Sequence, residues 1–506
     1  MAIGKNKICA VVAAPDARGM WKQLDAALRG GQKRRGSRPR GKTIELRLDW
    51  LKNDREIGLF LRLLARAKPH ATLIATCRRE AAGGKYRGSV AKQLVRMAEA
   101  LRAGCRWYDL EIESIRECPA ELLDVLLGDG KRLASAHFFQ GVPRDLDRVV
   151  RELSATRSDA IKVAAQCNSL AEGLRVLRLA RRKPNVVAVP MGDAVLPLRV
   201  LAGREGSALS YAPVKNSTAP GQLSLDEMEN LYRADLLDRG TQVYGIIGDP
   251  VNHSLSPVVH NAAFRARRIN AVYLPFLVWS LPDFLVAIEP LGIAGFSITL
   301  PHKQAILRHL DDCDPVAAAI GAVNTVAVRR GRLHGYNTDY IGVLRALEPR
   351  IRLRGSRVLI AGAGGAARAA AFALARAGSA VFICARRKER ARELAKAVQG
   401  ETVDWKDLKR TSFDVIVNAT PVGMYPSIHE SPLEAGDLNC RLVFDMIYRP
   451  RQTRLLRLAV RRGIESVPGI EMFIAQGIAQ WEIWTGKRAP ANVMRRVAIR
   501  ALEDKA

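Results

Sequence analysis

Lys162 stands in a sequence context that suits covalent chemistry on a ketone. It lies in the apolar stretch 159–163, where burial would desolvate its ammonium group and arginines from neighbouring strands would repel its charge. Both effects favour the neutral amine, which can attack a ketone to form an iminium and so ease removal of an adjacent proton. His137 could carry that proton, because imidazole titrates near neutral pH. A single lysine at a strand end, or a single histidine, more often has a structural role. Taken one at a time, Lys162 and His137 could therefore each be structural.

Three short motifs further along the chain suit the reduction of a ketone. They are S-I-T-L-P-H-K ending at Lys303, G-A-V-N-T containing Asn324, and G-Y-N-T-D ending at Asp339. Ketone reduction needs a proton donor beside the carbonyl, and a lysine held near a carboxylate and an amide can supply one. Ser254 and Ser256 precede a predicted helix, where hydroxyls and backbone N–H groups bind carboxylates. Alone, the two serines would indicate an ordinary helix cap.

A glycine-rich turn lies between a predicted strand, 358–361, and a predicted apolar helix, 366–377. Its residues are Gly362, Ala363, Gly364, Gly365 and Ala366. This order of strand, turn and helix is typical of a dinucleotide-binding fold, although G-x-G-G-A departs from the strict fingerprint. The turn therefore predicts a Rossmann-type lobe that holds the cofactor.

The next predicted strand, 381–384, ends in basic residues instead of an acid. The candidate phosphate contacts are Arg386, Arg387 and Arg390. NAD enzymes usually place a carboxylate here for the ribose hydroxyls, and that carboxylate would repel a 2′-phosphate, whereas arginines attract one. The sequence therefore predicts NADP(H) as the cofactor, with an exposed basic loop as the alternative.

The elements that must position Lys162 and His137 form a regular series. Short β-branched or apolar runs alternate with segments of helical apolar spacing, such as 57–67, 90–103, 146–153 and 170–179. The eight predicted strands are 8–13, 43–48, 72–76, 107–112, 132–136, 160–163, 186–189 and 208–211. Such a series predicts an α/β fold that begins with a TIM-type (β/α)8 barrel.

Barrel enzymes collect their catalytic side chains where strands end. Polar residues occupy such positions on several predicted strands: Glu45 and Arg47 on the second, Arg78 ending the third, His137 ending the fifth, Lys162 ending the sixth, and Arg199 after the seventh. We expect these side chains to share one pocket. The basic stretch 29–42 precedes the second strand and is expected at the opposite end of the barrel.

A second αβ series follows the barrel and opens with the predicted strand 243–247. The polar segment 223–239 is expected to be helical, and the helix 472–484 is expected to return to the first part of this series. The predicted division is a barrel over 1–228, a linker over 229–240, a substrate lobe over 241–340, a Rossmann lobe over 341–469, and C-terminal helices over 470–506 that rejoin the substrate lobe.

The composition narrows the class of protein. The 506 residues include 80 Lys and Arg against 50 Asp and Glu, a formal net charge of +30. The stretch 29–42 has no aromatic residue to stack on bases, so a solvated loop is expected instead of a nucleic-acid contact. No apolar run is long enough to cross a bilayer, and the scattered cysteines lack a C-x-x-C pair. We therefore expect a cytoplasmic protein with no membrane partner and no catalytic metal.

The motifs of the first half resemble those of type I 3-dehydroquinate dehydratases over residues 7–228. The resemblance rests on E-L-R-L-D at 45–49, T-C-R at 76–78, His137, Lys162 and A-P-G-Q at 219–222. It implies that Lys162 forms a Schiff base and that His137 is the general acid and base. It also implies the substrate-binding residues Glu45, Arg47, Arg78, Arg199, Thr218 and Gln222. The chain departs from the family pattern at Ala82, Phe138 and Leu198, where Glu, an acid or amide, and Ser are usual.

The second half resembles shikimate dehydrogenases over residues 242–500, on the paired serines and the three motifs around Lys303, Asn324 and Asp339. The resemblance implies that Lys303 and Asp339 are the catalytic pair. It implies the substrate-binding residues Ser254, Ser256, Thr299, Asn324, Tyr448 and Gln476. Further implied cofactor contacts are Thr420, Met446 and Gly469. Ser297 stands where the family commonly carries asparagine.

Together the two resemblances imply a fusion of two shikimate-pathway enzymes, which serves chorismate and aromatic amino acid biosynthesis. Dehydration of 3-dehydroquinate gives 3-dehydroshikimate, and NADPH-dependent reduction gives shikimate, so the first product is the second substrate. One alternative is a quinate/shikimate dehydrogenase with an impaired dehydratase half. A basic, RNA-associated scaffold without catalysis is the other. The sequence leaves the oligomeric state open.

Overall fold

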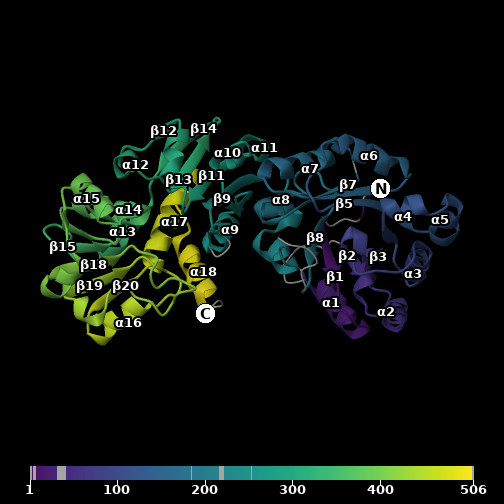
Figure 1. Cartoon of the computed structure of the whole chain (residues 1–506), viewed down its shortest axis with the longest axis horizontal. Helices are drawn as coiled ribbons and strands as arrows, with labels where there is room; N and C mark the ends of the chain where they lie inside the picture. The colour runs from purple at the N-terminus through teal and green to yellow at the C-terminus, as the bar shows by residue number, and fades with distance from the viewer. Residues whose placement is uncertain are drawn as a thin grey trace. The chain divides into compact units, whose positions relative to one another are not determined.

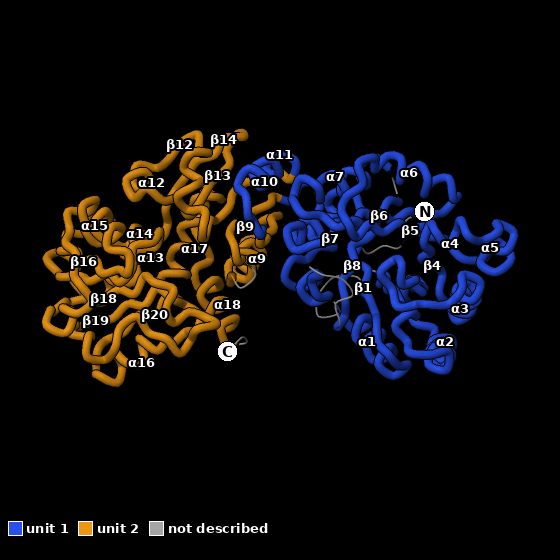
Figure 2. Tube along the Cα trace, viewed as in Figure 1, with its two compact units in different colours: residues 1–241, 276–290 blue, residues 242–275, 291–506 orange. Residues whose placement is uncertain are grey.

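The computed structural model describes residues 3, 7–30, 41–183, 185–215, 222–251 and 254–503. The chain forms two compact units, Met1–Thr241 with Phe276–Pro290 and Gln242–Pro275 with Leu291–Ala506 (Figure 2). Most of the basic stretch 29–42 lies outside the described residues, so its predicted position is not tested. Within the described part of the chain, no helix is long and apolar enough to cross a membrane.

The first unit contains a parallel sheet of the eight predicted strands. They are β1 (Ile8–Val12), β2 (Lys42–Arg47), β3 (Ala71–Thr76), β4 (Trp107–Glu111), β5 (Lys131–Phe138), β6 (Ala160–Gln166), β7 (Val186–Met191) and β8 (Ser210–Pro213). The order is β7-β6-β5-β4-β3-β2-β1-β8. The hydrogen bond from Ala208 N, two residues before β8, to Val186 O of β7 (2.9 Å) joins the two ends of the sheet, which nearly closes it into a barrel. The predicted barrel is confirmed.

Helices cover the outside of this barrel (Figure 1). They are α1 (Ala17–Arg29), α2 (Asp54–Ala67), α3 (Val90–Arg102), α4 (Ile112–Glu117), α5 (Ala120–Leu127), α6 (Leu146–Ala155), α7 (Leu170–Arg182) and α8 (Leu196–Leu201). Several begin at a side chain that accepts a hydrogen bond from a backbone N–H group three residues on, namely Asp16, Asn53, Ser89, Asp145 and Ser169. Each such cap is worth ~1 kcal/mol.

Two predictions for this unit were wrong in detail. Lys162 does not end β6 but is its third residue, so the lysine lies deeper in the barrel than expected. The segment 223–239 is not one helix: a π-helix at Glu227–Leu231 and a 3-10 helix at Ala234–Leu236 are separated by Tyr232 and Arg233. The left-handed backbone of Arg233, at φ 54°, breaks the helical path there.

The second unit contains two sheets. The first has the order β10-β9-β11-β13-β14-β12. Its strands are β9 (Gln242–Gly248), β10 (Ala271–Leu277), β11 (Ile293–Ile298), β12 (Asp312–Cys313), β13 (Thr325–Arg329) and β14 (Arg332–Tyr336). Strand β11 runs parallel to β9 and antiparallel to β13. Helices α9 (Ser256–Ala266) and α12 (Pro315–Ile320) lie between these strands in sequence, and α13 (Asp339–Leu347) follows β14. Helix α10 (Leu281–Leu285) and most of α11 (Ile288–Leu291), which also fall between them in sequence, belong to the first unit.

The second sheet is parallel throughout, in the order β17-β16-β15-β18-β19-β20. Its strands are β15 (Arg357–Ala361), β16 (Ala380–Cys384), β17 (Glu401–Thr402), β18 (Phe413–Asn418), β19 (Cys440–Asp445) and β20 (Glu465–Pro468), with helices α14 (Gly365–Arg376), α15 (Lys388–Ala397) and α16 (Arg454–Arg461). This 3-2-1-4-5-6 order is that of a Rossmann fold, which confirms the predicted fold class. The strand order reverses between β15 and β18, where such folds bind dinucleotides.

The chain ends in α17 (Ile470–Thr485) and α18 (Ala491–Glu503). Helix α17 packs on α13, and α18 packs on α9. The indole Nε1 of Trp484 donates a hydrogen bond to the Val326 carbonyl of β13 (2.9 Å). The C-terminal helices therefore lie against the first sheet of this unit, although they follow the Rossmann sheet in sequence.

Candidate functional sites

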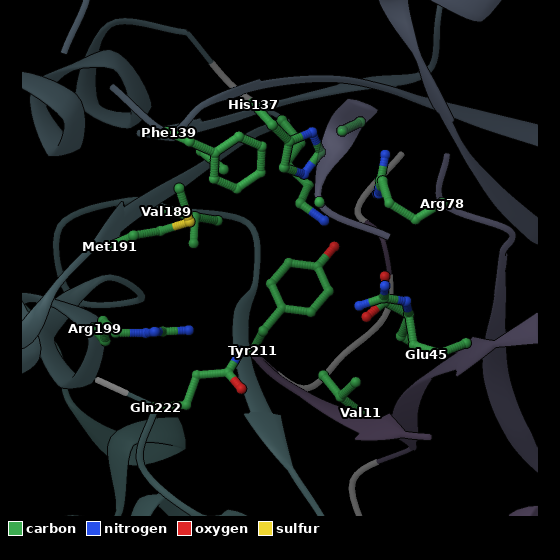
Figure 3. Close-up of a pocket in the computed structure, with 15 residues that line it drawn as sticks. Val11, Glu45, Arg78, His137, Phe139, Val189, Met191, Arg199, Tyr211 and Gln222 are labelled. Atoms are coloured by element: carbon green, nitrogen blue, oxygen red, sulfur yellow. The ribbon is translucent and has the colours of Figure 1, made fainter. Parts of the chain in front are cut away.

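A pocket lies inside the barrel and is lined by polar residues from many of its strands (Figure 3). Its lining residues are Val11, Glu45, Arg47, Arg78, Ala82, Gly83, His137, Phe139, Lys162, Ala164, Val189, Met191, Arg199, Tyr211 and Gln222. These include every predicted barrel-site residue that the structure describes. Thr218 lies outside the described residues.

Strand register explains why these side chains meet. Ser135 of β5 lies opposite Lys162 of β6, and His137 lies opposite Ala164. Since alternate side chains of a strand face the same side, His137 and Ser135 share the interior face with Lys162. The same alternation turns Glu45 and Arg47 of β2 inward.

Lys162 is buried and paired with a carboxylate that the sequence argument overlooked. Its Nζ donates a hydrogen bond to Asp109 Oδ2 (2.9 Å) and lies 4.3 Å from the centroid of the Tyr211 ring. Asp109 also forms an ion pair with Arg78 (2.7 Å). Burial alone would raise the pKa of Asp109, but the charges of Arg78 and Lys162 outweigh it and hold that pKa well below its usual range. The lysine therefore has an anionic partner as well as cationic neighbours.

His137 is neutral in this surrounding. Burial, followed by the charges of Arg78 and Lys162, lowers the pKa of its imidazole well below 6.5. Its Nδ1 is buried without a hydrogen-bond partner among the residues that the structure describes, and its ring stacks on Phe139 with centroids 6.3 Å apart. A neutral imidazole with an uncommitted nitrogen can accept a proton.

Two of the remaining polar residues of the pocket already form hydrogen bonds with other side chains of the protein. Arg47 forms two hydrogen bonds with Asp49 (2.8 and 2.9 Å). Glu45 accepts one from the Thr76 hydroxyl (2.8 Å). Burial lowers the pKa of Arg199 to about 10, so its guanidinium keeps a positive charge at neutral pH. Arg199 and Gln222 point into the pocket from the side opposite Arg78 (Figure 3).

Sequence reasoning missed Asp109, Tyr211, Phe139 and Met191. Asp109 and Glu111 occupy alternate positions of the short strand β4, which is buried along its whole length. Two acids with period-two spacing on an apolar strand indicate that both face the barrel interior, so the sequence did hold a signal for Asp109. Phe139 and Met191 lack such a signal, because apolar side chains at strand ends are equally expected in a core.

The second site is built around the predicted pair Lys303 and Asp339. Lys303 Nζ donates a hydrogen bond to Asp339 Oδ2 (2.6 Å). Asn324 Nδ2 donates to Asp339 Oδ1 (2.8 Å) and to the Thr338 hydroxyl (3.0 Å). Asp339 is the first residue of α13, where the helix dipole favours a carboxylate. The lysine, the carboxylate and the amide are therefore assembled as the motifs predicted.

Helix α17 brings Gln476 to this pair. The Thr338 hydroxyl lies 3.5 Å from Gln476 Oε1, and Gln476 Nε2 donates to the Phe473 carbonyl (2.9 Å). The Tyr448 ring packs on Phe473 with centroids 4.7 Å apart. Burial raises the pKa of Tyr448, while Arg449 and a hydrogen bond with Ser254 oppose the rise. Gln476 and Tyr448 are thus linked through α17.

Ser256 and Thr299 complete the predicted substrate residues. Ser256 begins α9 and its backbone N–H donates to the Ser254 hydroxyl (3.2 Å). Ser256 also contacts Tyr273. Burial raises the pKa of the Tyr273 phenol, and the hydrogen bonds of this phenol with Ser297 and Ser256 oppose that rise. Thr299 follows β11 and its N–H donates to the Ile247 carbonyl (2.9 Å).

The hydroxyl of Ser297, which stands where the family commonly carries asparagine, forms hydrogen bonds with two other side chains of the protein. It accepts a hydrogen bond from the Tyr273 hydroxyl (2.7 Å) and donates to Gln480 Oε1 (3.0 Å). The hydrogen bond to Gln480 therefore links β11 to α17.

The glycine-rich turn fits a dinucleotide. Gly362 has φ 122°, and a Cβ atom there would meet the Ala419 carbonyl at 3.0 Å, so a larger residue is excluded. A Cβ atom on Gly365 would lie 3.4 Å from Lys303 Cδ, so the turn and Lys303 are neighbours. Around Gly364, a Cβ atom would meet open space, which leaves room for a phosphate group at the start of α14.

The predicted 2′-phosphate contacts lie at the end of the next strand. Arg386, Arg387 and Arg390 are exposed after β16, and their side chains form no hydrogen bond or ion pair with the described residues. Free guanidinium groups beside the glycine turn suit a phosphate ester.

A buried network fixes the loops after β18 and β19. Asn418 Oδ1 accepts hydrogen bonds from the backbone N–H (2.9 Å) and the hydroxyl (2.7 Å) of Thr420. Asn418 Nδ2 donates to Asp445 Oδ1 (3.0 Å), and Met446 N–H donates to the Asn418 carbonyl (3.0 Å). At Gly469, a Cβ atom would lie 2.5 Å from the Met446 carbonyl. Thr420, Met446 and Gly469 therefore follow the ends of three neighbouring strands, β18, β19 and β20, and Thr420 is the one next to the switch point.

The type I 3-dehydroquinase family model matches residues 8–238. Models of the shikimate dehydrogenase substrate binding domain, shikimate/quinate 5-dehydrogenase and the shikimate 5′-dehydrogenase C-terminal domain match residues 246–326, 345–453 and 469–499. The chloroplastic bifunctional 3-dehydroquinate dehydratase/shikimate dehydrogenase of Arabidopsis thaliana is 36% identical over 475 residues, which cover 89% of this chain and 78% of the relative. The chain belongs to the bifunctional 3-dehydroquinate dehydratase/shikimate dehydrogenase family.

As a member of this bifunctional family, the chain combines a lyase with an oxidoreductase of the shikimate pathway. The shikimate dehydrogenase (NADP(+)) of Symbiobacterium thermophilum is 43% identical over 280 residues, or 52% of this chain and 95% of the relative. A solved chorismate mutase/shikimate 5-dehydrogenase fusion protein from Clostridium acetobutylicum aligns with a TM-score of 0.50 at 30% identity, over 53% of this chain and 98% of that chain. The cofactor of the dehydrogenase half is NADP(H), as the arginines after β16 predicted.

Proposed function

We propose that the chain converts 3-dehydroquinate to shikimate in two steps, the first at Lys162 and His137 and the second at Lys303 and Asp339. The observation that carries this proposal is the placement of Lys162 and neutral His137 in one pocket, with an independent Lys303–Asp339 pair beside a glycine turn. Two complete catalytic sets favour this function over a dehydrogenase with an impaired dehydratase half.

In the first step, Lys162 gives a proton to neutral His137 and its amine attacks the substrate ketone. The ketone oxygen then leaves as water, taking one proton from the amine and one from His137, and an iminium remains on Lys162. His137 next removes the α-proton, and the resulting enamine expels the β-hydroxyl, which leaves as water with the proton that His137 returns. Hydrolysis of the new iminium frees 3-dehydroshikimate and Lys162.

The charged residues of the pocket supply binding. The substrate carries a carboxylate, and the guanidinium of Arg199 offers it a charge-assisted, bidentate contact. Arg78 is already bound to Asp109 and Ser135, so we assign it chiefly to holding Asp109 against Lys162. Glu45 and Gln222 face the same space and are proposed to contact substrate hydroxyls.

For the second step, the glycine turn and the arginines after β16 would hold NADPH, which when bound would supply the hydride for reduction of the ketone. Lys303 donates the proton that the new alkoxide needs, and Asp339 orients the lysine through its 2.6 Å hydrogen bond. Ser254, Ser256 and Gln476 are proposed to bind the substrate around this pair. Asn324 holds Asp339 from the other side.

A direct test follows each step with its own variant. Lys162→Ala is expected to abolish dehydration, and also the covalent attachment of substrate to the protein when borohydride is added to reduce the iminium. Lys303→Ala is expected to abolish reduction of 3-dehydroshikimate. Each variant should keep the other activity, which also reports that the chain is folded. Full dehydration by Lys162→Ala would contradict the Schiff-base assignment.

We further propose a cytoplasmic location, without assigning an oligomeric state. The eight cysteines Cys9, Cys77, Cys105, Cys118, Cys167, Cys313, Cys384 and Cys440 are all free thiols, which suits a reducing compartment. Cell fractionation with an antibody to the chain would test the location, and recovery with an organelle or membrane fraction would contradict it.

A further inference from the structure

Tyr211 is a residue of the barrel pocket to which the two-step scheme gives no role. It belongs to β8, its side chain is 5% exposed, and it lines the pocket that holds Lys162. Its hydroxyl is buried without a hydrogen-bond partner among the described residues. A buried hydroxyl without a partner destabilises the empty pocket, so a hydrogen-bond partner from the substrate would be favoured there.

The position of the ring relates Tyr211 to the covalent step. Lys162 Nζ lies 4.3 Å from the ring centroid, within the range of a cation–π contact. Figure 3 shows the hydroxyl at the centre of the pocket, between His137 and Glu45. The ketone carbon must come within bonding distance of Lys162 Nζ, and both Lys162 and Tyr211 line this pocket, so the ketone oxygen can reach the hydroxyl.

The hydroxyl can act only as a donor towards that oxygen. Burial, followed by the charge of Glu45 and the neighbouring Cys9, raises the pKa of Tyr211 well above its ordinary value of 10.0. The phenol therefore keeps its proton, and a protonated phenol next to a carbonyl oxygen donates a hydrogen bond to it.

We propose that the Tyr211 hydroxyl donates a hydrogen bond to the substrate ketone oxygen while Lys162 attacks, and that the ring face then stabilises the iminium cation. The inference rests on the proposed Schiff-base function of Lys162. No proton leaves Tyr211: the hydrogen bond polarises the carbonyl and strengthens as negative charge develops on its oxygen.

Exchange of the ketone oxygen with ¹⁸O-labelled water isolates this step. Reversible iminium formation from 3-dehydroshikimate replaces the ketone oxygen without the α-proton transfer of the dehydration. Tyr211→Phe removes the hydroxyl and keeps the ring. We expect its Lys162-dependent exchange rate and its dehydratase kcat to fall by about ten- to hundred-fold, with a smaller change in KM.

Controls separate a chemical role from a structural one. Tyr232→Phe removes the hydroxyl of another buried tyrosine of the same unit that does not line the pocket, and should leave exchange unchanged. Shikimate dehydrogenase activity reports folding of the chain, and Lys162→Ala gives the background exchange. Equal exchange in Tyr211→Phe and wild type would overturn the role of Tyr211 alone. Wild-type exchange at the Lys162→Ala level would overturn the Schiff-base function itself.

Discussion

Asp109 lies between two cations, with Oδ2 2.7 Å from Arg78 Nη2 and 2.9 Å from Lys162 Nζ. All three side chains are buried, so the carboxylate compensates charges that water cannot reach. It also fixes the direction of Lys162 before the substrate enters.

Replacing Asp109 by Asn keeps the shape but removes the negative charge. We expect dehydratase kcat to fall at least about ten-fold, because Arg78 and Lys162 would repel each other and Lys162 would lose its orientation. Steady-state assays with 3-dehydroquinate measure the effect. Exposed Asp129→Asn and the dehydrogenase activity of the same chain serve as controls. An unchanged kcat would show that Asp109 does not position the lysine.

The pH dependence of dehydration should reflect His137. Its pKa is lowered well below 6.5 in the folded enzyme, so the neutral form, which we propose accepts the α-proton, persists as pH falls through 6.5. We expect kcat/KM to hold its plateau at pH 6 and to decline only at lower pH. An acid limb centred at 6.5 or higher would contradict the environment described for His137.

Cofactor selectivity should depend on the basic group after β16. Replacing Arg386 and Arg387 by Ala is expected to raise the KM for NADPH about ten-fold or more, because each charge-assisted hydrogen bond contributes about 1.5–3 kcal/mol. The KM for NADH, which lacks the 2′-phosphate, should change little. Arg392→Ala on the exposed face of α15 is the matched control. Parallel losses with both cofactors would argue against a phosphate contact.

Asp445 should make stability depend on pH. Burial raises its pKa from 3.8 to about 6, against the opposing hydrogen bonds from Thr453, Ile447 and Asn418. Because the folded state then binds this proton more tightly than the unfolded state, the contribution of Asp445 to stability falls as pH rises from about 4 to 6. The loss is on the order of 3 kcal/mol.

Asp445→Asn removes this titration while keeping an acceptor for Asn418 and Ile447. We expect the variant to lose the part of the pH dependence of Tm that lies between pH 4 and 6, as measured by thermal unfolding of both proteins across that range. Superimposable Tm profiles would show that Asp445 titrates normally.

The sequence predicted the fold well because both parts repeat a simple local pattern. Alternation of short apolar strands with helices has few solutions, and the glycine turn after β15 placed the dinucleotide lobe within it. Strand boundaries were predicted less well: β6 continues through two alanines to Gln166, so Lys162 lies inside the strand and not at its end.

Sequence reasoning singled out residues inside distinctive motifs that the fold brings together, and it missed partners outside those motifs. Lys303, Asn324 and Asp339 come from three separate motifs, and the fold joins them by hydrogen bonds. Asp109 was missed because its role depends on facing Lys162 across the barrel, a relation that spans 53 positions of sequence. Tyr211 was missed because an aromatic residue on a strand is ordinarily part of a core.

The central claim is that one chain carries out both steps at two sites. Purified enzyme supplied with 3-dehydroquinate and NADPH should form shikimate. Lys162→Ala should leave 3-dehydroquinate unconsumed, and Lys303→Ala should accumulate 3-dehydroshikimate. Failure of the wild-type enzyme to form shikimate, while it still reduces added 3-dehydroshikimate, would contradict the account and leave a dehydrogenase with an inactive barrel.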